Sequence, residues 1–139
     1  MRAKKFHYDR LVKSEDLNHH RTLFAGRGAE WFIEAGFIAV ASVLPADTIV
    51  CYKVHGMTFS KPIHPGEIAC FESQIVKVGR TSLAVYVSLH TLKHSEKLLE
   101  GFITFVHINN EGKSEPHGLT LELETEEELL LNQQAQNLT

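Results

Sequence analysis

The chain has 139 residues, a formal net charge of -3 and a pI near 6.3. That length suffices for one domain with its own core and is too short for two of ordinary size. No Lys/Arg cluster exceeds Lys4-Lys5, which argues against a nucleic-acid partner. No apolar run reaches the length of a membrane span, and the N-terminus lacks the apolar core of a signal peptide, so we expect a cytoplasmic protein.

The first strand is predicted at residues 6–12, and the polar residues 13–21 form a loop before a glycine-bearing turn, residues 23–28. A long helix then runs from about Gly28 to Leu44, where Pro45 ends it. Its apolar residues recur at helical spacing: Ala29, Phe32, Ile33, Gly36, Phe37, Val40, Ala41 and Leu44. Because the opposite side is apolar too, this pattern predicts a buried helix.

Glu30 and Glu34 are the only acids of this helix and lie one turn apart. Glu34 is predicted to lie among Trp31, Phe37 and Ile38, with little room for water. A buried carboxylate must be partnered, protonated or functional.

Four further segments are rich in Val, Ile, Phe, Tyr or Thr and predict long strands. They are residues 48–59, interrupted at Gly56, and residues 67–78, 82–92 and 98–108. The turns between the last three are short, which implies antiparallel neighbours. In residues 82–92 large apolar residues alternate with others, so one face meets the helix and the other faces water or a partner. The fold class is therefore α+β.

The C-terminal segment differs in character. Leu119, Leu121 and Leu123 alternate with polar residues, and Thr125-Glu126-Glu127-Glu128 has the form of a capping box before three leucines. We expect a short C-terminal helix with a capped, solvated start. Cys51 and Cys70 form no CxxC motif or zinc-type ligand cluster, so we expect reduced thiols, no metal and no cofactor.

Five segments, taken together and in order, resemble the hotdog-fold acyl-CoA thioesterases. They are Asn18 with Leu23-Phe24-Ala25-Gly26, then Ile33-Glu34-Ala35-Gly36, then residues 59–67, then Val78-Gly79-Arg80-Thr81-Ser82, and finally residues 102–106. The resemblance implies a long helix wrapped by a curved antiparallel sheet. It also implies homodimers with active sites at the dimer interface, often assembled into larger oligomers. We expect a single hotdog domain at residues 1–118 and a strand/helix tail at residues 119–139.

Thioester hydrolysis places negative charge on the carbonyl oxygen, which N–H groups at a helix N-terminus stabilise. Gly26 and its neighbours offer such groups, although a plain tight turn into the helix would need the same glycines. A carboxylate must activate water, and Glu34 is the candidate. In the family, however, the essential acid usually stands one residue earlier, where this chain has Ile33. A buried structural role for Glu34 therefore stays open.

By resemblance, Asn18 holds the lytic water or the thioester. His19 and His20 replace the residues usually found after it, and His20 is an additional candidate for acid–base chemistry, with a solvated loop histidine as the alternative. His55 is a further candidate whose facing the sequence does not fix. Arg80 is the best candidate for phosphate contact because guanidinium matches phosphate oxygens.

The resemblance places CoA-binding residues at Arg80, Thr81 and Ser82, and at Phe24 and Gly28. Lys61 and Lys77 could add positive charge there, or lie on ordinary solvated surface.

Two functions fit these residues. The first is hydrolysis of acyl-CoA thioesters by a carboxylate-activated water. The second, suggested by Ile33, is non-catalytic binding of acyl-CoA by a sensor, carrier or regulatory dimer in lipid metabolism.

Overall fold

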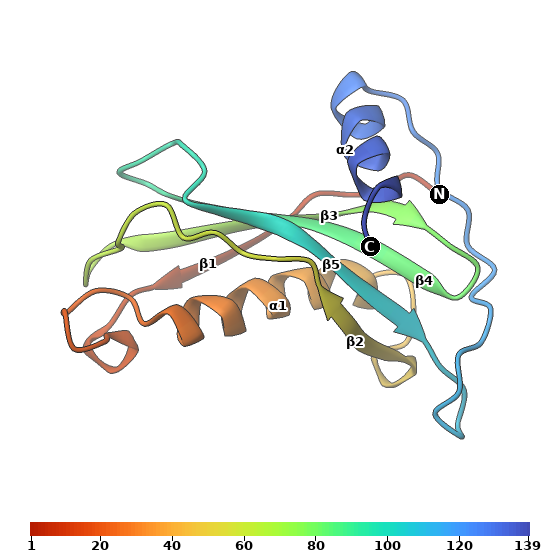
Figure 1. Ribbon diagram of the computed structural model, residues 1–139, viewed down its shortest axis with the longest axis horizontal. Helices are drawn as coiled ribbons and strands as arrows, with labels where there is room; N and C mark the ends of the chain where they lie inside the picture. The colour runs from red at the N-terminus through yellow and green to blue at the C-terminus, as the bar shows by residue number, and fades with distance from the viewer.

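A computed structural model describes residues 1–139 and places one long helix against a five-stranded antiparallel sheet. The elements in chain order are β1 (Phe6–Leu11), a 3-10 turn (Ser14–Asp16), α1 (Ala25–Ala41), a second 3-10 turn (Ala46–Thr48), β2 (Ile49–Val54), β3 (Ile68–Val78), β4 (Ser82–Thr91), β5 (Leu99–His107) and α2 (Glu126–Gln136). The strand order is β1-β3-β4-β5-β2, and α1 runs along one face of the curved sheet (Figure 1). The predicted α+β hotdog architecture is confirmed.

The ends of two elements differ from the prediction. Helix α1 begins at Ala25 and ends at Ala41, three residues earlier than expected at both ends. Phe24 is extended (φ -63, ψ 128) and its N–H donates to the Asp16 carbonyl at 2.8 Å, so the helix begins directly after it. Strand β2 ends at Val54 because Gly56 turns the chain with a φ of 94°.

The inner face of the sheet forms the main core with α1. Leu83, Val85, Val87 and Leu89 of β4 all point into it, as their alternation predicts. On α1, the Phe32 side chain is fully buried in this core. Gly36 permits α1 to approach β5 closely. A Cβ at Gly36 would lie 2.9 Å from Ile103 Cδ1, so a larger residue there would push α1 off β5.

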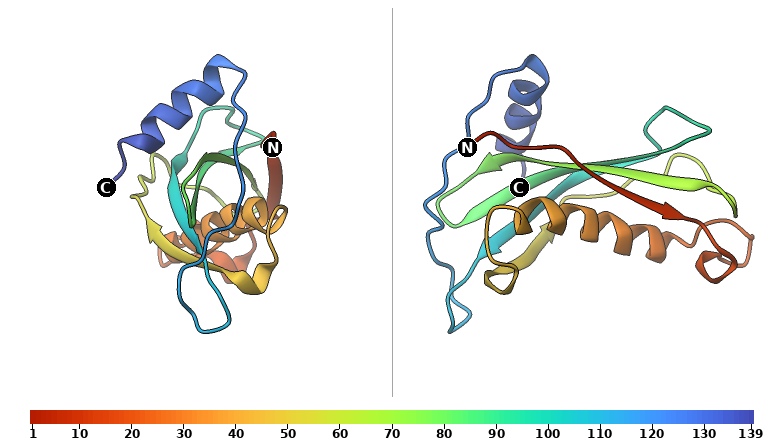
Figure 2. Two further views of the ribbon diagram at one scale, coloured as in Figure 1. Left: turned by 90° about the vertical axis from the view of Figure 1, so that its right-hand side faces the viewer. Right: turned by 180° about the vertical axis from the view of Figure 1, so that it is seen from behind.

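Helix α2 covers part of the outer face of the sheet (Figure 2). Its Leu131 and Ala135 form a small second cluster with three sheet residues: Val76, Ala84 and Tyr86. The predicted capping box is confirmed, because the Thr125 hydroxyl accepts from the Glu128 N–H at 3.1 Å and the Glu128 carboxylate accepts from the Thr125 N–H at 2.9 Å. The outer face is thus covered at one end by this chain's own tail.

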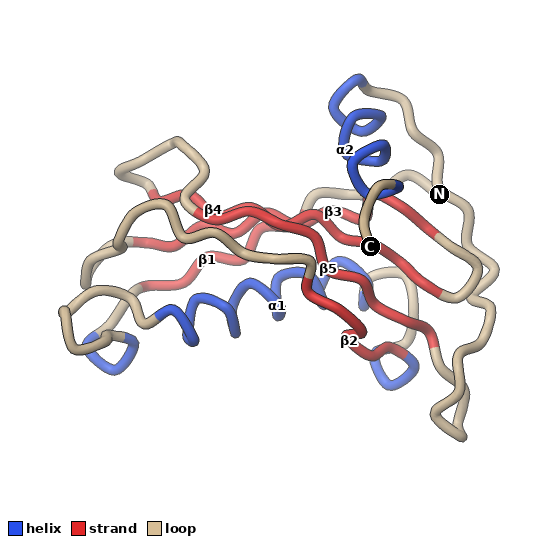
Figure 3. The backbone as a smooth tube through the Cα atoms, viewed as in Figure 1, coloured by secondary structure: helices blue, strands red, loops and turns tan.

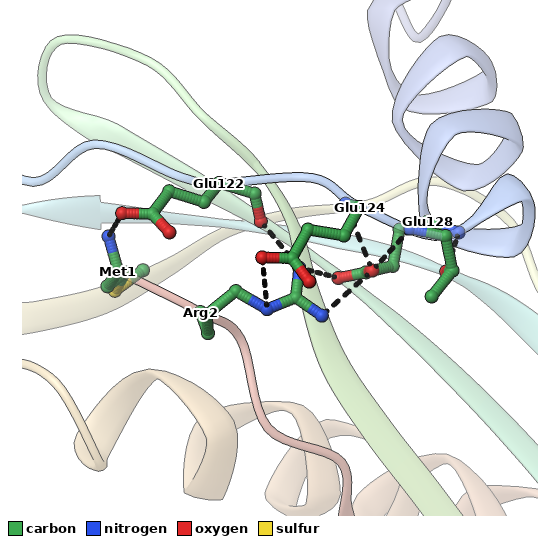
Figure 4. Close-up of polar contacts among 6 residues, drawn as sticks. Met1, Arg2, Glu122, Glu124 and Glu128 are labelled. Carbon is green, nitrogen blue, oxygen red and sulfur yellow. Dashed lines mark hydrogen bonds and ion pairs between the residues drawn. The ribbon is translucent and has the colours of Figure 1, made fainter.

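The N-terminal residues hold α2 in place (Figure 4). The Arg2 guanidinium donates to both carboxylate oxygens of Glu128, at 2.9 and 3.1 Å, while the amino group of Met1 donates to the Thr120 carbonyl at 2.8 Å. Backbone N–H donation from Thr125, together with Arg2, lowers the pKa of Glu128 to about 2. The solvated helix start that we expected is therefore partly buried.

The segment between β5 and α2 crosses the end of the sheet as a long loop (Figure 3). The strand-like alternation at residues 119–123 forms no strand there, and only an isolated parallel bridge joins Glu122 to Arg2.

Candidate functional site

The N-terminus of α1 presents free backbone donors. Phe24 supplies no side-chain cap, and the first turn contains no acid. The Phe24 carbonyl accepts hydrogen bonds from the N–H groups of Arg27 and Gly28, both at 3.0 Å. The N–H groups of Ala25 and Gly26 have no acceptor within the protein. Unpaired N–H groups at the positive end of a helix dipole form a favourable place for an anionic oxygen.

Gly26 also allows a close contact in this turn. A Cβ there would lie 2.6 Å from Phe24 Cε2, inside van der Waals contact. The Phe24 ring is 54% exposed and therefore stands at the surface beside the free N–H groups. Gly28 is buried, and a Cβ at its position would touch Phe59 and Leu23 at 3.4 and 3.5 Å. A side chain at position 26 would therefore displace the Phe24 ring, whereas a Cβ at position 28 would make ordinary contacts.

A cleft of about 210 Å³ opens next to this helix start. Most of its lining is apolar, so it suits an uncharged hydrocarbon group. The lining residues are Asn18, Leu23, Ala25, Phe59, Ser60, Lys61, Pro62, Ile63, Leu89, Leu98 and Leu99.

Asn18 is held by its own loop at the edge of this cleft. Its Oδ1 accepts from the N–H groups of His20 and Thr22, at 2.9 and 3.2 Å. The side-chain amide Nδ2 donates to no protein atom and is the donor that remains for a ligand. Arg21, in the same loop, has a φ of 64°, a conformation that a non-glycine residue rarely adopts. Such strained residues are often found at functional sites.

His20 lies outside the cleft. Its ring is exposed and packs against that of His19, with 3.9 Å between the centroids and 43° between the ring planes. Within a single chain, His20 is therefore a solvated loop histidine, the alternative to a role in acid–base chemistry.

The predicted burial of Glu34 is wrong. Its side chain is exposed, and Oε2 accepts a hydrogen bond from the Tyr8 hydroxyl at 2.8 Å. Arg10 donates to the same hydroxyl oxygen at 2.6 Å and lies over the Trp31 ring at 4.7 Å. The sheet covers only one side of α1, so the apolar residues on the other side do not enclose this carboxylate.

Tyr8 and Arg10 are functional candidates that our reading of the sequence missed. Burial raises the pKa of the Tyr8 hydroxyl, and its hydrogen bond to the Glu34 carboxylate raises it further. The residues alternate in β1, where positions 6, 8 and 10 are half-buried and the residues between them exposed. Reading that alternation against α1 would have placed Tyr8 and Arg10 beside the helix.

Asp16 is a third missed residue. It is only 3% exposed, and its carboxylate accepts from the Lys13 N–H at 2.9 Å and lies 3.5 Å from Arg27 Nε. It ties the first 3-10 turn to the start of α1 and so fixes the loop that carries Asn18.

Ile33 is half-buried against the core and contributes no polar group. The position where the family usually carries its acid is thus a packing position in this chain.

Arg80 and Thr81 lie in the turn between β3 and β4, and Ser82 is the first residue of β4. That turn is at the opposite end of the sheet from the start of α1, as Figure 1 shows. One chain therefore does not bring the predicted CoA-phosphate residues to Gly26. Lys61 lies at the cleft but is paired with Glu96 at 2.6 Å, whereas His55 and Lys77 lie together on the outer face.

No group of three or more His, Cys, Asp or Glu residues is arranged to hold a metal ion. None of the helices has the length and apolar character needed to cross a membrane.

Comparisons with known proteins agree with this geometry. Residues 20–97 match the model of the thioesterase superfamily. The chain is 31% identical over 124 residues to YkhA of Bacillus subtilis, an uncharacterised acyl-CoA thioester hydrolase, covering 86% of this chain and 71% of that protein.

Two solved structures are similar over 95% of this chain. One is a hexameric acyl-CoA thioesterase in its apo form, with 27% identity, a TM-score of 0.84 and 86% of its own chain covered. The other is an acyl-CoA hydrolase from Staphylococcus aureus in complex with butyryl coenzyme A and coenzyme A, with 26% identity, a TM-score of 0.81 and 79% of its chain covered.

Proposed function

Because the chain belongs to the thioesterase superfamily, we propose that it hydrolyses acyl-CoA thioesters to a free acid and CoA. The observation that carries this proposal is the uncapped start of α1 beside an apolar cleft. The N–H groups of Ala25 and Gly26 would stabilise the negative charge that develops on the thioester carbonyl oxygen. The cleft would receive the acyl chain.

Asn18 is proposed to position the attacking water or the thioester through its free Nδ2 donor, since its Oδ1 is already used within the loop. His20 is a secondary candidate for this role, and takes part only if its contact with the His19 ring opens on binding. The exposed Phe24 ring beside the helix start would contact the CoA part of the substrate, whereas Gly28, which the resemblance also places there, is buried behind Phe59 and Leu23.

Glu34 is the proposed general base, and a second copy of the chain is needed to place it. Glu34 follows Gly26 by eight residues, which corresponds to about 12 Å along a helix axis. A base must come within hydrogen-bond reach of the water that it activates, directly or through one further water. We therefore infer that Glu34 of one chain acts at the helix start of another.

The surface of α1 that the sheet leaves uncovered supports such an interface. Ile38 is only half-buried there, on the same side as the exposed Glu34, and Ile33 and Phe37 lie half-buried at its edge, where they also pack against the core. A second copy packed on this surface would bury them. An interface site would also let Arg80, Thr81 and Ser82 of one chain contact the phosphates of a CoA bound at another.

The test follows the release of free thiol from acyl-CoAs of increasing chain length. Replacing Glu34→Gln should lower kcat by about 10²- to 10⁴-fold, the usual contribution of a general base. Glu30→Gln is the matched control, because it removes the other exposed carboxylate of α1 one turn away and should leave kcat nearly unchanged. If Glu34→Gln stays fully active, Glu34 is not the base, although hydrolysis itself stands.

A mixing experiment tests whether the site is shared between chains. Asn18→Ala and Glu34→Gln are each expected to be nearly inactive. If each site takes Asn18 and Glu34 from different chains of a dimer, random reassembly of an equal mixture should restore about a quarter of wild-type activity. No recovery after verified subunit exchange would place both residues in one chain and contradict the interface site.

The second candidate is acyl-CoA binding without hydrolysis. It is favoured by Ile33 at the usual position of the acid and by the engagement of Glu34 with Tyr8. Tight binding of acyl-CoA, with negligible thiol release from both wild type and Glu34→Gln, would select this function over the first.

A further inference from the structure

Four side chains form a row across the outer face of the sheet. Lys77 of β3 pairs with Ala84 of β4, Ala84 with Thr104 of β5, and Thr104 with Lys53 of β2. Directly paired residues of antiparallel strands point to the same face. Ala84 belongs to the cluster beneath α2, so the whole row faces away from α1. The two lysines stand about 14 Å apart at their Cα atoms, three strand spacings, with small residues between them.

Both lysines follow a β-bulge. The register shifts between Ile75 and Lys77 in the β3–β4 pair, and between Cys51 and Lys53 in the β2–β5 pair. Bulges re-aim side chains and are frequent beside binding sites. The two bulges lie at the same level of the sheet, and they direct the Lys53 and Lys77 side chains over the surface formed by Ala84 and Thr104.

This row of four residues forms the base of a pocket of about 190 Å³, which is large enough for several water molecules. Its lining residues are Tyr52, Lys53, His55, Lys77, Ser82, Ala84, Thr104, Ala135, Leu138 and Thr139. None of these side chains belongs to Asp or Glu, although Thr139 carries the terminal carboxylate of the chain. Neither Lys53 nor Lys77 forms an ion pair with that group or with any other carboxylate.

His55 adds a polar group that is held in place. Its Nε2 lies 2.7 Å from Thr104 Oγ1. Burial lowers the pKa of this imidazole, and the charges of Lys53 and Lys77 lower it further. The pocket therefore joins two unpaired cations to a neutral ring and to the Ser82 and Thr104 hydroxyls.

We propose that this pocket, between Lys53 and Lys77 on the outer face, is a second binding site that takes a phosphate group. Lysine ammonium groups bind phosphate as point charges, and hydroxyls complete the hydrogen bonding. The site lies on the opposite face of the sheet from α1 and does not depend on thioester hydrolysis. A free nucleotide or the phosphates of a CoA molecule could supply the group.

Calorimetric titration of the full-length protein at low salt tests the site with four probes: inorganic phosphate, ADP, CoA and dephospho-CoA. The double variant Lys53→Gln/Lys77→Gln should weaken phosphate and ADP binding about tenfold or more, because two charge-assisted contacts are lost. Lys93→Gln is the control, since Lys93 is an exposed lysine of another turn, and should change binding by less than about twofold. NMR signals of the His55 ring should shift on addition of phosphate.

Equal weakening for all four probes identifies a general phosphate site, whereas weakening confined to CoA, with dephospho-CoA unaffected, identifies the 3′-phosphate of CoA as the occupant. The proposal is overturned if the double variant binds every probe as the Lys93→Gln protein does, or if neither phosphate nor CoA shifts the His55 signals. Neither readout involves turnover, so failure of the thioesterase proposal would leave this test intact.

Discussion

The two faces of the one sheet differ in what they are built to do. The inner face meets α1 through a core of 19 buried apolar residues, whereas the outer face meets α2 through a cluster of five. Buried polar side chains also lie on the outer face, among them Gln74 of β3 and Ser88 of β4. Burying polar groups costs free energy unless they are hydrogen-bonded, so a face that carries them contributes less to folding than an apolar face does. The inner face therefore contributes most of the apolar burial, whereas the outer face carries α2 and the polar pocket between Lys53 and Lys77.

A substitution in the inner core should show the largest effect. Phe71 of β3 is fully buried and packs 6.2 Å from the Tyr8 ring. Phe71→Ala should lower the free energy of unfolding by about 3–5 kcal/mol, from lost apolar burial and the cavity left behind. Denaturant unfolding followed by circular dichroism measures this change. A loss below about 1 kcal/mol would mean that the inner face is not the dominant core.

The matching substitution on the outer face should cost less. Leu131 of α2 is 7% exposed and contacts only the small cluster. Leu131→Ala should lower the free energy of unfolding by about 2 kcal/mol, the low end for a buried leucine. Leu130→Ala is its control, because Leu130 is 56% exposed and should change stability by less than about 0.5 kcal/mol. If Leu131→Ala matched Phe71→Ala, the two faces would be energetically equal and the comparison would fail.

The strands and the fold class were predictable from the sequence because alternation and turn residues are local signals. The alternation in β4 identified its inner face, and the Thr125–Glu128 spacing identified the cap of α2. The start of α1 was harder to predict. Glycines at 26 and 28 resemble a loop, and only the bond from Phe24 N–H to Asp16 O shows that the helix begins before them.

The candidate site was less predictable because it depends on what covers each surface. The pattern around α1 showed apolar residues on both sides, but it could not show whether sheet, water or a second chain lies against Glu34. Arg80 and Gly26 similarly belong to motifs that suggest one site. The topology, however, places the β3–β4 turn and the start of α1 at opposite ends of the sheet. The row from Lys53 to Lys77 depends on two bulges, which no spacing in the sequence reveals.

The smallest effect is expected at the ion pair that holds α2 to the N-terminus. The pKa of Glu128 is lowered from 4.5 to about 2, so the folded protein favours the ionised carboxylate. This contribution is complete above pH 4.5, the ordinary pKa, and is lost as the pH falls towards 2, the folded pKa.

Glu128→Gln keeps the capping geometry but removes the charge that pairs with Arg2. The difference in Tm between wild type and Glu128→Gln should therefore be constant near neutral pH and should shrink progressively below 4.5. Glu126→Gln, an exposed acid in the same turn of α2, should show no such convergence. A Tm difference that stayed constant through this acid range would mean that Arg2 and the Thr125 N–H do not hold the charged form of Glu128. Helix α2 would then be anchored to the outer face by its other contacts, which include Leu131, Ala135 and the Asn132 side chain that donates to the Val76 carbonyl.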